Sequence, residues 1–148
     1  MEISTRDFGI VSVEEDALYD FPEGLYGFEE DTRFAVFHKS FDDIDFLYLQ
    51  SVLNVIPCFL VFEPEDFLPG YAPILSKEDL ASCGAEGPED LIFLVIANVP
   101  GAVEEMSINI KSPVVLNPKT KIGRQVILQN SDYKVRYQPF LNKENGGI

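Results

Sequence analysis

The chain has 148 residues and a formal net charge of −14, and 46% of its residues are hydrophobic. A chain of this length and composition folds as one domain that buries about 70% of its unfolded surface, so intrinsic disorder is excluded. The longest uncharged apolar run, residues 52–62, is too short to cross a bilayer, and the N-terminus lacks a secretory signal. We therefore expect a cytoplasmic protein without a membrane partner.

Strand signals outnumber helix signals along the chain. Short runs rich in β-branched, aromatic and aliphatic residues predict strands at residues 8–13, 33–38, 46–50, 58–62, 91–97, 106–111, 114–116, 125–128 and 133–137. Only residues 76–84 have clear helix signals, namely a serine N-cap, acidic residues in the first turn and a terminating glycine, and residues 64–67 favour one short turn. The pattern predicts an all-β fold, a small antiparallel barrel-like domain with one or two short helices.

Residues 33–38 and 46–50 are apolar on both faces of the strands they predict. Phe34 and Val36 lie on one face of their strand, and Ala35 and Phe37 lie on the other. Such strands are typical of a closed barrel wall with an additional outer layer, or of a binding surface. We expect a single domain over residues 1–141, followed by a flexible tail at residues 142–148, where polar residues and two glycines follow the last aromatic residue.

Charge is divided unevenly between the two ends of the sequence. Residues 1–110 carry 23 acidic and four basic residues, whereas residues 111–148 carry two acidic and seven basic residues. Clustered acids repel the phosphates of nucleic acid and favour a basic protein partner, so we expect no direct nucleic-acid binding. The C-terminal cations either neutralise the acidic body or engage an acidic patch or chain terminus of a partner, and we favour the first reading.

The sequence contains no recognisable catalytic constellation. The single histidine, His38, has no cysteine or histidine beside it, and phosphate-binding or nucleophile-elbow motifs are missing. Cys58 and Cys83 are expected to be free thiols in a reducing compartment. Carboxylate pairs are abundant in so acidic a chain, which leaves a small β-barrel enzyme with a carboxylate pair as an alternative. We expect no enzyme activity, no metal and no cofactor.

Two segments carry the most specific patterns. Residues 21–29 place a proline and two glycines between aromatic residues, which predicts a tight turn anchored by its apolar side chains. Residues 107–117 read as a strand, a break at a proline and a second strand. We assign architectural roles to residues in and near these segments: Phe21, Gly24, Leu25, Gly27, Phe28, Gln50, Asn109, Pro113, Asn117 and Gln125.

The loop at residues 67–71 is a candidate partner-binding element. Its composition, Phe-Leu-Pro-Gly-Tyr, is compatible with an exposed aromatic patch, although a loop folded into its own core is equally consistent with it. Acidic residues precede the loop, so that charge and apolar anchors adjoin. The predicted partner-binding residues are Glu63, Glu65, Asp66, Phe67 and Tyr71.

Taken together, these segments resemble the family of the flagellar assembly factor FliW over roughly residues 8–137. The resemblance rests on the 21–28 turn, Leu49-Gln50-Ser51, Pro64 with Phe67 and Tyr71, residues 109–117, and residues 125–128. The sequence departs from the family pattern at Tyr26, Ser112 and Val114, which are small changes at turn or buried positions.

The resemblance implies a regulatory protein with two protein partners. Members of this family bind the RNA-binding repressor CsrA, by a mechanism that family behaviour suggests is allosteric, and relieve its block on flagellin translation. They also bind newly made flagellin, which withdraws them from CsrA. A structural module of a larger assembly is the remaining alternative to this reading and to the enzyme.

Overall fold

The computed structural model describes residues 1–141. Its strands are β1 Glu2–Thr5, β2 Gly9–Ser12, β3 Leu18–Asp20, β4 Arg33–Phe41, β5 Ile44–Ser51, β6 Cys58–Phe62, β7 Ile92–Asn98, β8 Ser107–Ile108, β9 Val114–Asn117 and β10 Ile122–Gln125. The helix α1 spans Lys77–Ser82, and single 3-10 turns are η1 Glu15–Ala17, η2 Pro64–Asp66, η3 Pro88–Asp90 and η4 Val103–Glu105. Within the described residues, no helix is long and apolar enough to cross a bilayer.

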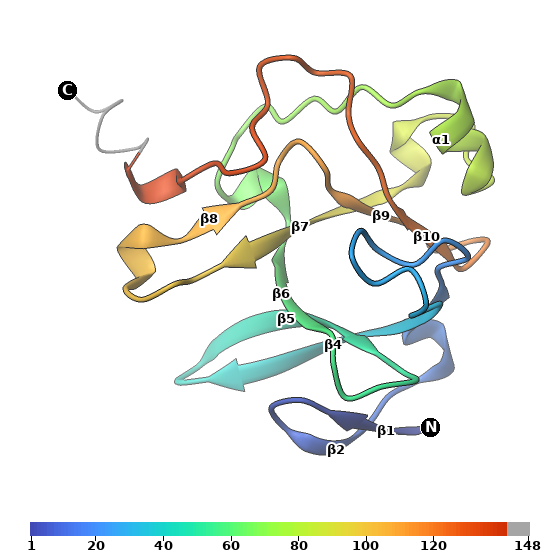
Figure 1. The fold of residues 1–148 in the computed structure, drawn as a ribbon, viewed down its shortest axis with the longest axis vertical. Helices are drawn as coiled ribbons and strands as arrows, with labels where there is room; N and C mark the ends of the chain where they lie inside the picture. Colours follow the sequence, from blue (N-terminus) through green and yellow to red (C-terminus); the bar gives the residue numbers. More distant parts are fainter. Residues whose placement is uncertain (142–148) are drawn as a thin grey trace.

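Seven of these strands close into a barrel, which confirms the predicted all-β class (Figure 1). The ring runs in the order β3-β4-β5-β6-β7-β9-β10, and its neighbours pair antiparallel except where β10 returns to β3. That closing contact is parallel and consists of the single pair Ile122 and Asp20. Closure pairs the edges that an open sheet would expose to other chains.

The barrel interior is filled around Phe21. This side chain is fully buried and meets the ring of Phe34 edge-on at a centroid distance of 5.0 Å. Gly123 of β10 leaves the room that Phe21 occupies, because a Cβ there would collide with the Phe21 ring and lie 2.9 Å from Leu116. The barrel core contains the side chains of Tyr19, Phe21, Leu25, Phe34, Leu49, Val61, Leu94, Val114 and Leu116.

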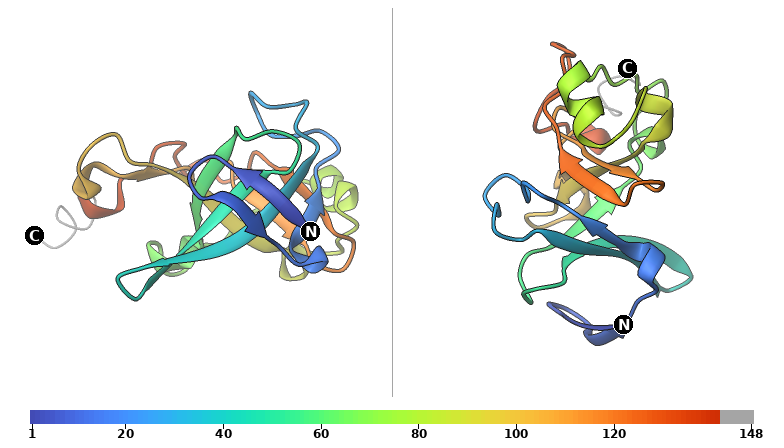
Figure 2. Two further views of the ribbon diagram at one scale, coloured as in Figure 1. Left: turned by 90° about the horizontal axis from the view of Figure 1, so that it is seen from below. Right: turned by 90° about the vertical axis from the view of Figure 1, so that its right-hand side faces the viewer.

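The β1–β2 hairpin forms an outer layer over β4 and β5 (Figure 2). Ile3 and Val13 pack on Ala35 and Phe37, which face away from the barrel core, and Phe8 meets the ring of Tyr48 edge-on at 5.0 Å. The apolar character of both faces of β4 is therefore explained by a barrel core on one side and a hairpin on the other.

A second covering layer lies over β7 and β9 at the opposite end of the molecule (Figure 2). The helix α1 and the segments that follow η2 and β10 enclose a core that includes Cys83, Val95, Ile108, Val115 and Leu128. The predicted helix is confirmed, since the Ser76 hydroxyl accepts a hydrogen bond from the backbone N–H of Asp79 at 3.0 Å.

Several strand predictions were wrong in extent. Residues 133–137 form no strand and contribute only an isolated bridge between Ile108 and Tyr137. The strand predicted at residues 125–128 is not formed, because β10 ends at Gln125. The next residue, Val126, donates its N–H to the carbonyl of Pro113 at 3.1 Å, but Pro113 has no N–H to donate in return. The segment 106–111 keeps its alternation of buried isoleucines, yet only Ser107–Ile108 is strand. The short strands β1 and β3 were missed.

Residues 142–148, for which a flexible tail was predicted, lie outside the described residues.

The predicted turn at residues 21–28 depends on Gly24, which allows a substitution test. Gly24 has φ +63°, and an added Cβ would meet the Phe28 carbonyl oxygen and lie 2.7 Å from the Cα of Glu29. Gly27 has φ +87° with open space around it. We expect Gly24→Ala to lower the free energy of unfolding by at least about 2 kcal/mol and Gly27→Ala by only about 1 kcal/mol, because only Gly24→Ala adds a backbone collision to the strain. Urea unfolding measures both, and equal losses would contradict this account.

Gln50 fastens the β5–β6 loop to the β1–β2 turn. Its buried side chain accepts from the backbone N–H of Arg6 at 3.1 Å and donates to the carbonyl of Val55 at 2.9 Å. We expect Gln50→Leu to destabilise the fold by about 2 kcal/mol, since it leaves these backbone groups without partners. The matched control is Gln129→Leu at an exposed side chain, which should change stability by less than about 0.5 kcal/mol. Thermal and urea unfolding report both, and equal effects would rule out the bracing role.

Candidate functional site

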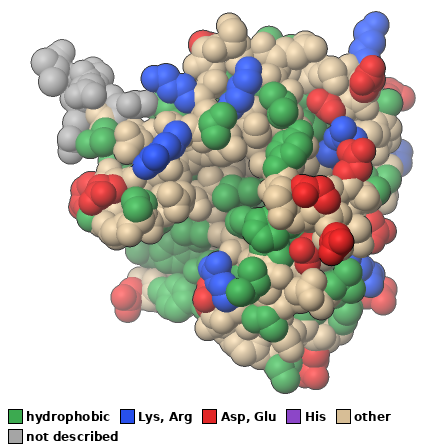
Figure 3. Space-filling view, in the orientation of Figure 1, with side chains coloured by type: hydrophobic (Ala, Val, Ile, Leu, Met, Phe, Trp, Pro, Cys, Tyr) green, Lys and Arg blue, Asp and Glu red, His purple; other side chains and the backbone are tan. Residues whose placement is uncertain are grey.

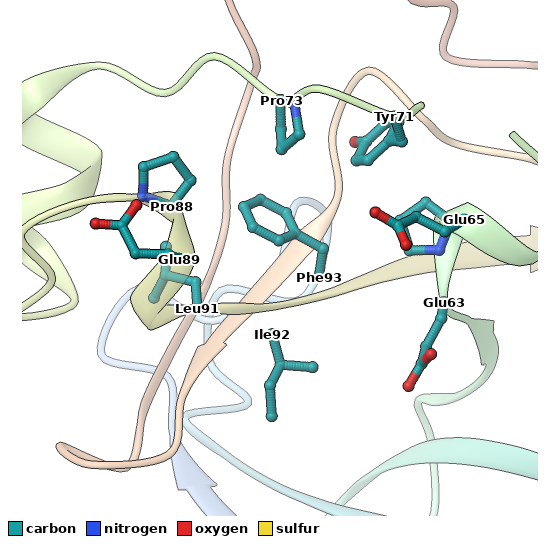
Figure 4. Close-up of a pocket in the computed structure, with 10 residues that line it drawn as sticks. Glu63, Glu65, Tyr71, Pro73, Pro88, Glu89, Leu91, Ile92 and Phe93 are labelled. Carbon is teal, nitrogen blue, oxygen red and sulfur yellow. The ribbon is translucent and has the colours of Figure 1, made fainter. Parts of the chain in front are cut away.

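A hollow with a volume of about 520 Å³ opens between η2, the chain at residues 71–73, η3 and the start of β7 (Figure 4). We call it the acidic groove. Its lining residues are Glu63, Pro64, Glu65, Tyr71, Pro73, Pro88, Glu89, Leu91, Ile92 and Phe93. Three of them are glutamates with exposed side chains, and the other seven are apolar or aromatic.

The glutamates lie at the ends of the groove and the apolar groups lie between them. Figure 4 shows the ring of Phe93 near the centre, with Glu89 at one end and Glu65 at the other. Pro73 lies between the two ends as well. This arrangement presents an apolar floor with negative charge at its margins.

Two short turns with the same sequence place two of the three glutamates. The tripeptide Pro-Glu-Asp forms η2 at residues 64–66 and again η3 at residues 88–90. Each proline begins its turn, where its fixed φ suits a helical first residue and its missing N–H would have no partner. Because both turns border the groove, Glu65 and Glu89 reach it from segments that are far apart in the chain.

The aromatic side of the groove is rigidly held. The hydroxyl of Tyr71 donates to the carbonyl of Ile110 at 2.8 Å, and its ring stacks on Tyr133 at a centroid distance of 5.0 Å. Burial raises the pKa of Tyr71 well above that of a free phenol, so the hydroxyl remains a donor. Tyr71 therefore contributes a fixed surface, although only 7% of the residue is exposed.

The structure brings together part of the predicted partner-binding set. Glu63, Glu65 and Tyr71 line the groove, whereas Asp66 and Phe67 do not. Phe67 is half-buried and packs edge-on against Phe62 at 5.2 Å, as in a loop folded onto its own core.

The sequence reading missed the other wall of the groove, formed by Pro88, Glu89 and residues 91–93. The repeated Pro-Glu-Asp tripeptide is the signal that could have linked this wall to Glu65.

The arrangement is suited to binding. The three glutamates are exposed, and Glu89 is at the far end of the groove from Glu65, so no desolvated carboxylate pair of the kind used in acid–base catalysis is formed there. Burial raises the pKa of Cys58 to about 11, which keeps it a thiol near neutral pH. Among residues 1–141, no three His, Cys, Asp or Glu side chains are placed to hold a metal ion.

The polar residues assigned to architecture make specific contacts. Gln125 accepts from the backbone N–H of Tyr26 at 3.1 Å and donates to the carbonyl of Ser112 at 3.1 Å, so it joins the two distinctive sequence segments. Asn109 caps the turn before Pro113 by accepting from the N–H of Ser112 at 2.9 Å.

Asn117 holds the end of β9 to the end of α1. Its side-chain amide donates to the carbonyl of Cys83 at 2.8 Å, and its oxygen accepts from the N–H of Lys119 at 3.0 Å.

Comparison with known proteins assigns almost the whole chain to one family. The profile of the FliW protein family matches residues 2–139. The flagellar assembly factor FliW of Thermoanaerobacter pseudethanolicus is 32% identical, with 93% of this chain and 91% of the relative covered. That of Leptospira interrogans serovar copenhageni is 36% identical, with 95% and 93% covered.

A solved structure agrees with these matches. A crystal structure of the flagellar assembly factor FliW superposes with a TM-score of 0.84 at 28% identity and covers 95% of this chain and 97% of its own. The chain belongs to the FliW family of flagellar assembly factors.

Proposed function

We propose that this chain regulates flagellum assembly by binding a CsrA-like RNA-binding repressor, thereby relieving repression of flagellin synthesis, and that flagellin competes with the repressor for it. Membership of the FliW family supports the role in flagellum assembly. The observation that carries the choice of the repressor is the acidic groove, an apolar floor with Glu63, Glu65 and Glu89 at its margins.

Charge favours a basic partner over RNA itself. A protein that binds RNA must present Lys and Arg to its phosphates, so its surface is attracted to a chain of net charge −14. Electrostatic attraction of this kind raises the association rate and selects the partner. The chain therefore acts on RNA through the repressor.

The apolar floor contributes binding free energy beyond that of the exposed charges. Exposed ion pairs contribute about 0 to 1 kcal/mol each, whereas aromatic and aliphatic groups in a pocket act as anchors at protein interfaces. Phe93, whose ring lies between Glu89 and Glu65, is in position to contact an apolar side chain of the repressor. We propose a binding role without catalysis.

Substitution of the groove glutamates tests the site. We expect Glu63→Gln, Glu65→Gln and Glu89→Gln together to weaken binding of the repressor about tenfold, as three ion pairs of about 0.5 kcal/mol would. The matched control is Glu14→Gln, Glu15→Gln and Asp16→Asn, which removes the same charge from η1 and its N-cap. The control should weaken binding less than twofold (about 0.4 kcal/mol). Calorimetric titration measures both, and equal losses would exclude the groove as the docking site.

The salt dependence of the association rate tests the electrostatic attraction between the two proteins, whichever surface of the chain binds the repressor. Raising salt from about 0.05 M to about 0.5 M shortens the Debye length from roughly 14 Å to roughly 4 Å. We expect the association rate with the repressor, measured by stopped-flow fluorescence, to fall at least severalfold. A rate that stays constant over this range would remove electrostatic attraction from the mechanism.

A gel-shift titration tests the function itself. The flagellin leader RNA is shifted by repressor, then titrated with this protein, and then flagellin is added. We expect shifted RNA, released RNA and shifted RNA in that order, because flagellin withdraws the antagonist by mass action. A complex of this protein with the leader alone, or an unchanged shift at saturating protein, would contradict the proposal.

A further inference from the structure

A second hollow, of about 420 Å³, lies at the mouth of the barrel. We call it the amide groove, because its polar lining consists of side-chain amides and hydroxyls and contains no charged residue. The lining residues are Leu25, Tyr26, Phe59, Ile96, Asn98, Ser107, Asn109, Ser112, Gln125 and Val135. They come from the 21–28 turn, β6, β7, β8, β10, the chain before β9 and the segment after residue 133.

The walls of the amide groove are fixed by hydrogen bonds. Gln125 joins the backbone of Tyr26 on one wall to the backbone of Ser112 on the other, at 3.1 Å each. Tyr26 and Val135 nevertheless remain 56% and 62% exposed. A preformed groove with exposed apolar groups binds a partner without the free-energy cost of ordering its own walls.

Positive charge lies beside the amide groove, on the two neighbours of its lining residue Val135. The N–H of Lys111 donates to the carbonyl of Lys134 at 3.2 Å, which sets residues 109–112 beside residues 134–136. Lys134 and Arg136 flank the groove-lining Val135, are exposed, and form no salt bridge within residues 1–141. Figure 3 shows Lys and Arg side chains gathered at the upper left, over the segments drawn in orange and red in Figure 1.

Among the C-terminal cations within residues 1–141, only Arg124 forms salt bridges with the acidic body. Arg124 lies 3.4 Å from Asp79 and also pairs with Glu23. Lys134 and Arg136 have no such partner among the described residues, on a chain whose net charge is −14. Cations kept apart from so many carboxylates are available to acids of another molecule.

We propose that the amide groove docks an acidic, extended segment of a partner protein. Asn98, Asn109 and Ser107 offer the donors and acceptors that the main chain of an extended peptide requires, and Tyr26 and Phe59 offer apolar contacts. Lys134 and Arg136 attract the carboxylates of the segment. Lys134 and Arg136 repel a basic partner such as the repressor.

Two blocked synthetic peptides of equal length test the proposal, one alternating aspartate with valine and the other alternating lysine with valine. Each is titrated into the isotopically labelled full chain at about 0.05 M salt and followed by amide chemical shifts. We expect the acidic peptide to shift the amides of Ile96, Asn98 and Val135, and the basic peptide to shift residues of the acidic groove instead. Equal shifts in the amide groove for both peptides, or none, would overturn the proposal.

Charge reversal identifies the cations responsible. We expect Lys134→Glu with Arg136→Glu to weaken binding of the acidic peptide at least about tenfold, because two attractions become repulsions. The matched control, Lys77→Glu with Lys119→Glu, changes the charge equally on α1 and on the β9–β10 turn and should leave the dissociation constant within about twofold. Equal losses in both variants would reduce the effect to net charge and overturn the proposal.

Sedimentation of the unliganded wild-type chain tests whether a second copy of the chain occupies the amide groove. A dimer that disappears in the Lys134→Glu, Arg136→Glu variant would assign the groove to a second copy and overturn the proposed acidic partner. A monomer at all concentrations, together with the peptide results, supports it.

Discussion

The burial of Phe21 inside the closed barrel is the contact on which the other features depend. Its side chain has no exposed surface and fills space that Gly123 leaves free, so the turn that follows it begins from a fixed point. Gly24 then turns the chain where any Cβ would strike the backbone of residues 28 and 29. Because interiors are close-packed, loss of either residue affects the barrel and its mouth together.

Strand β7 links the two grooves. Ile92 and Phe93 near its start line the acidic groove, and Ile96 and Asn98 near its end line the amide groove. The first groove is bordered by carboxylates and the second has Lys134 and Arg136 beside its lining residue Val135, so the two proposed docking sites differ in the sign of the charge that they attract. One well-packed strand of the barrel thus holds two surfaces of opposite character at a fixed separation.

Hydrogen bonds from polar side chains explain why several uncharged polar residues of the distinctive segments are buried or half-buried. Gln50, Asn109, Asn117 and Gln125 each accept from one backbone N–H, and all but Asn109 also donate to a carbonyl of a separate segment. Buried polar groups are tolerated when they are hydrogen-bonded in this way, and they fix the relative positions of the loops they join. The resemblance to FliW proteins therefore rests largely on residues that shape the molecule.

The sequence by itself determined the all-β class, the helix α1 with its Ser76 cap, the turn at residues 21–28 and the family, because each depends on local pattern or local backbone geometry. It could not place β1 or β3, whose few residues become strands only through pairing with partners. Nor could it join Glu65 to Glu89, or set Lys134 beside Lys111. The members of each pair are separated by many residues in the chain, and only closure of the barrel and packing of its covering segments place them on one groove or side by side.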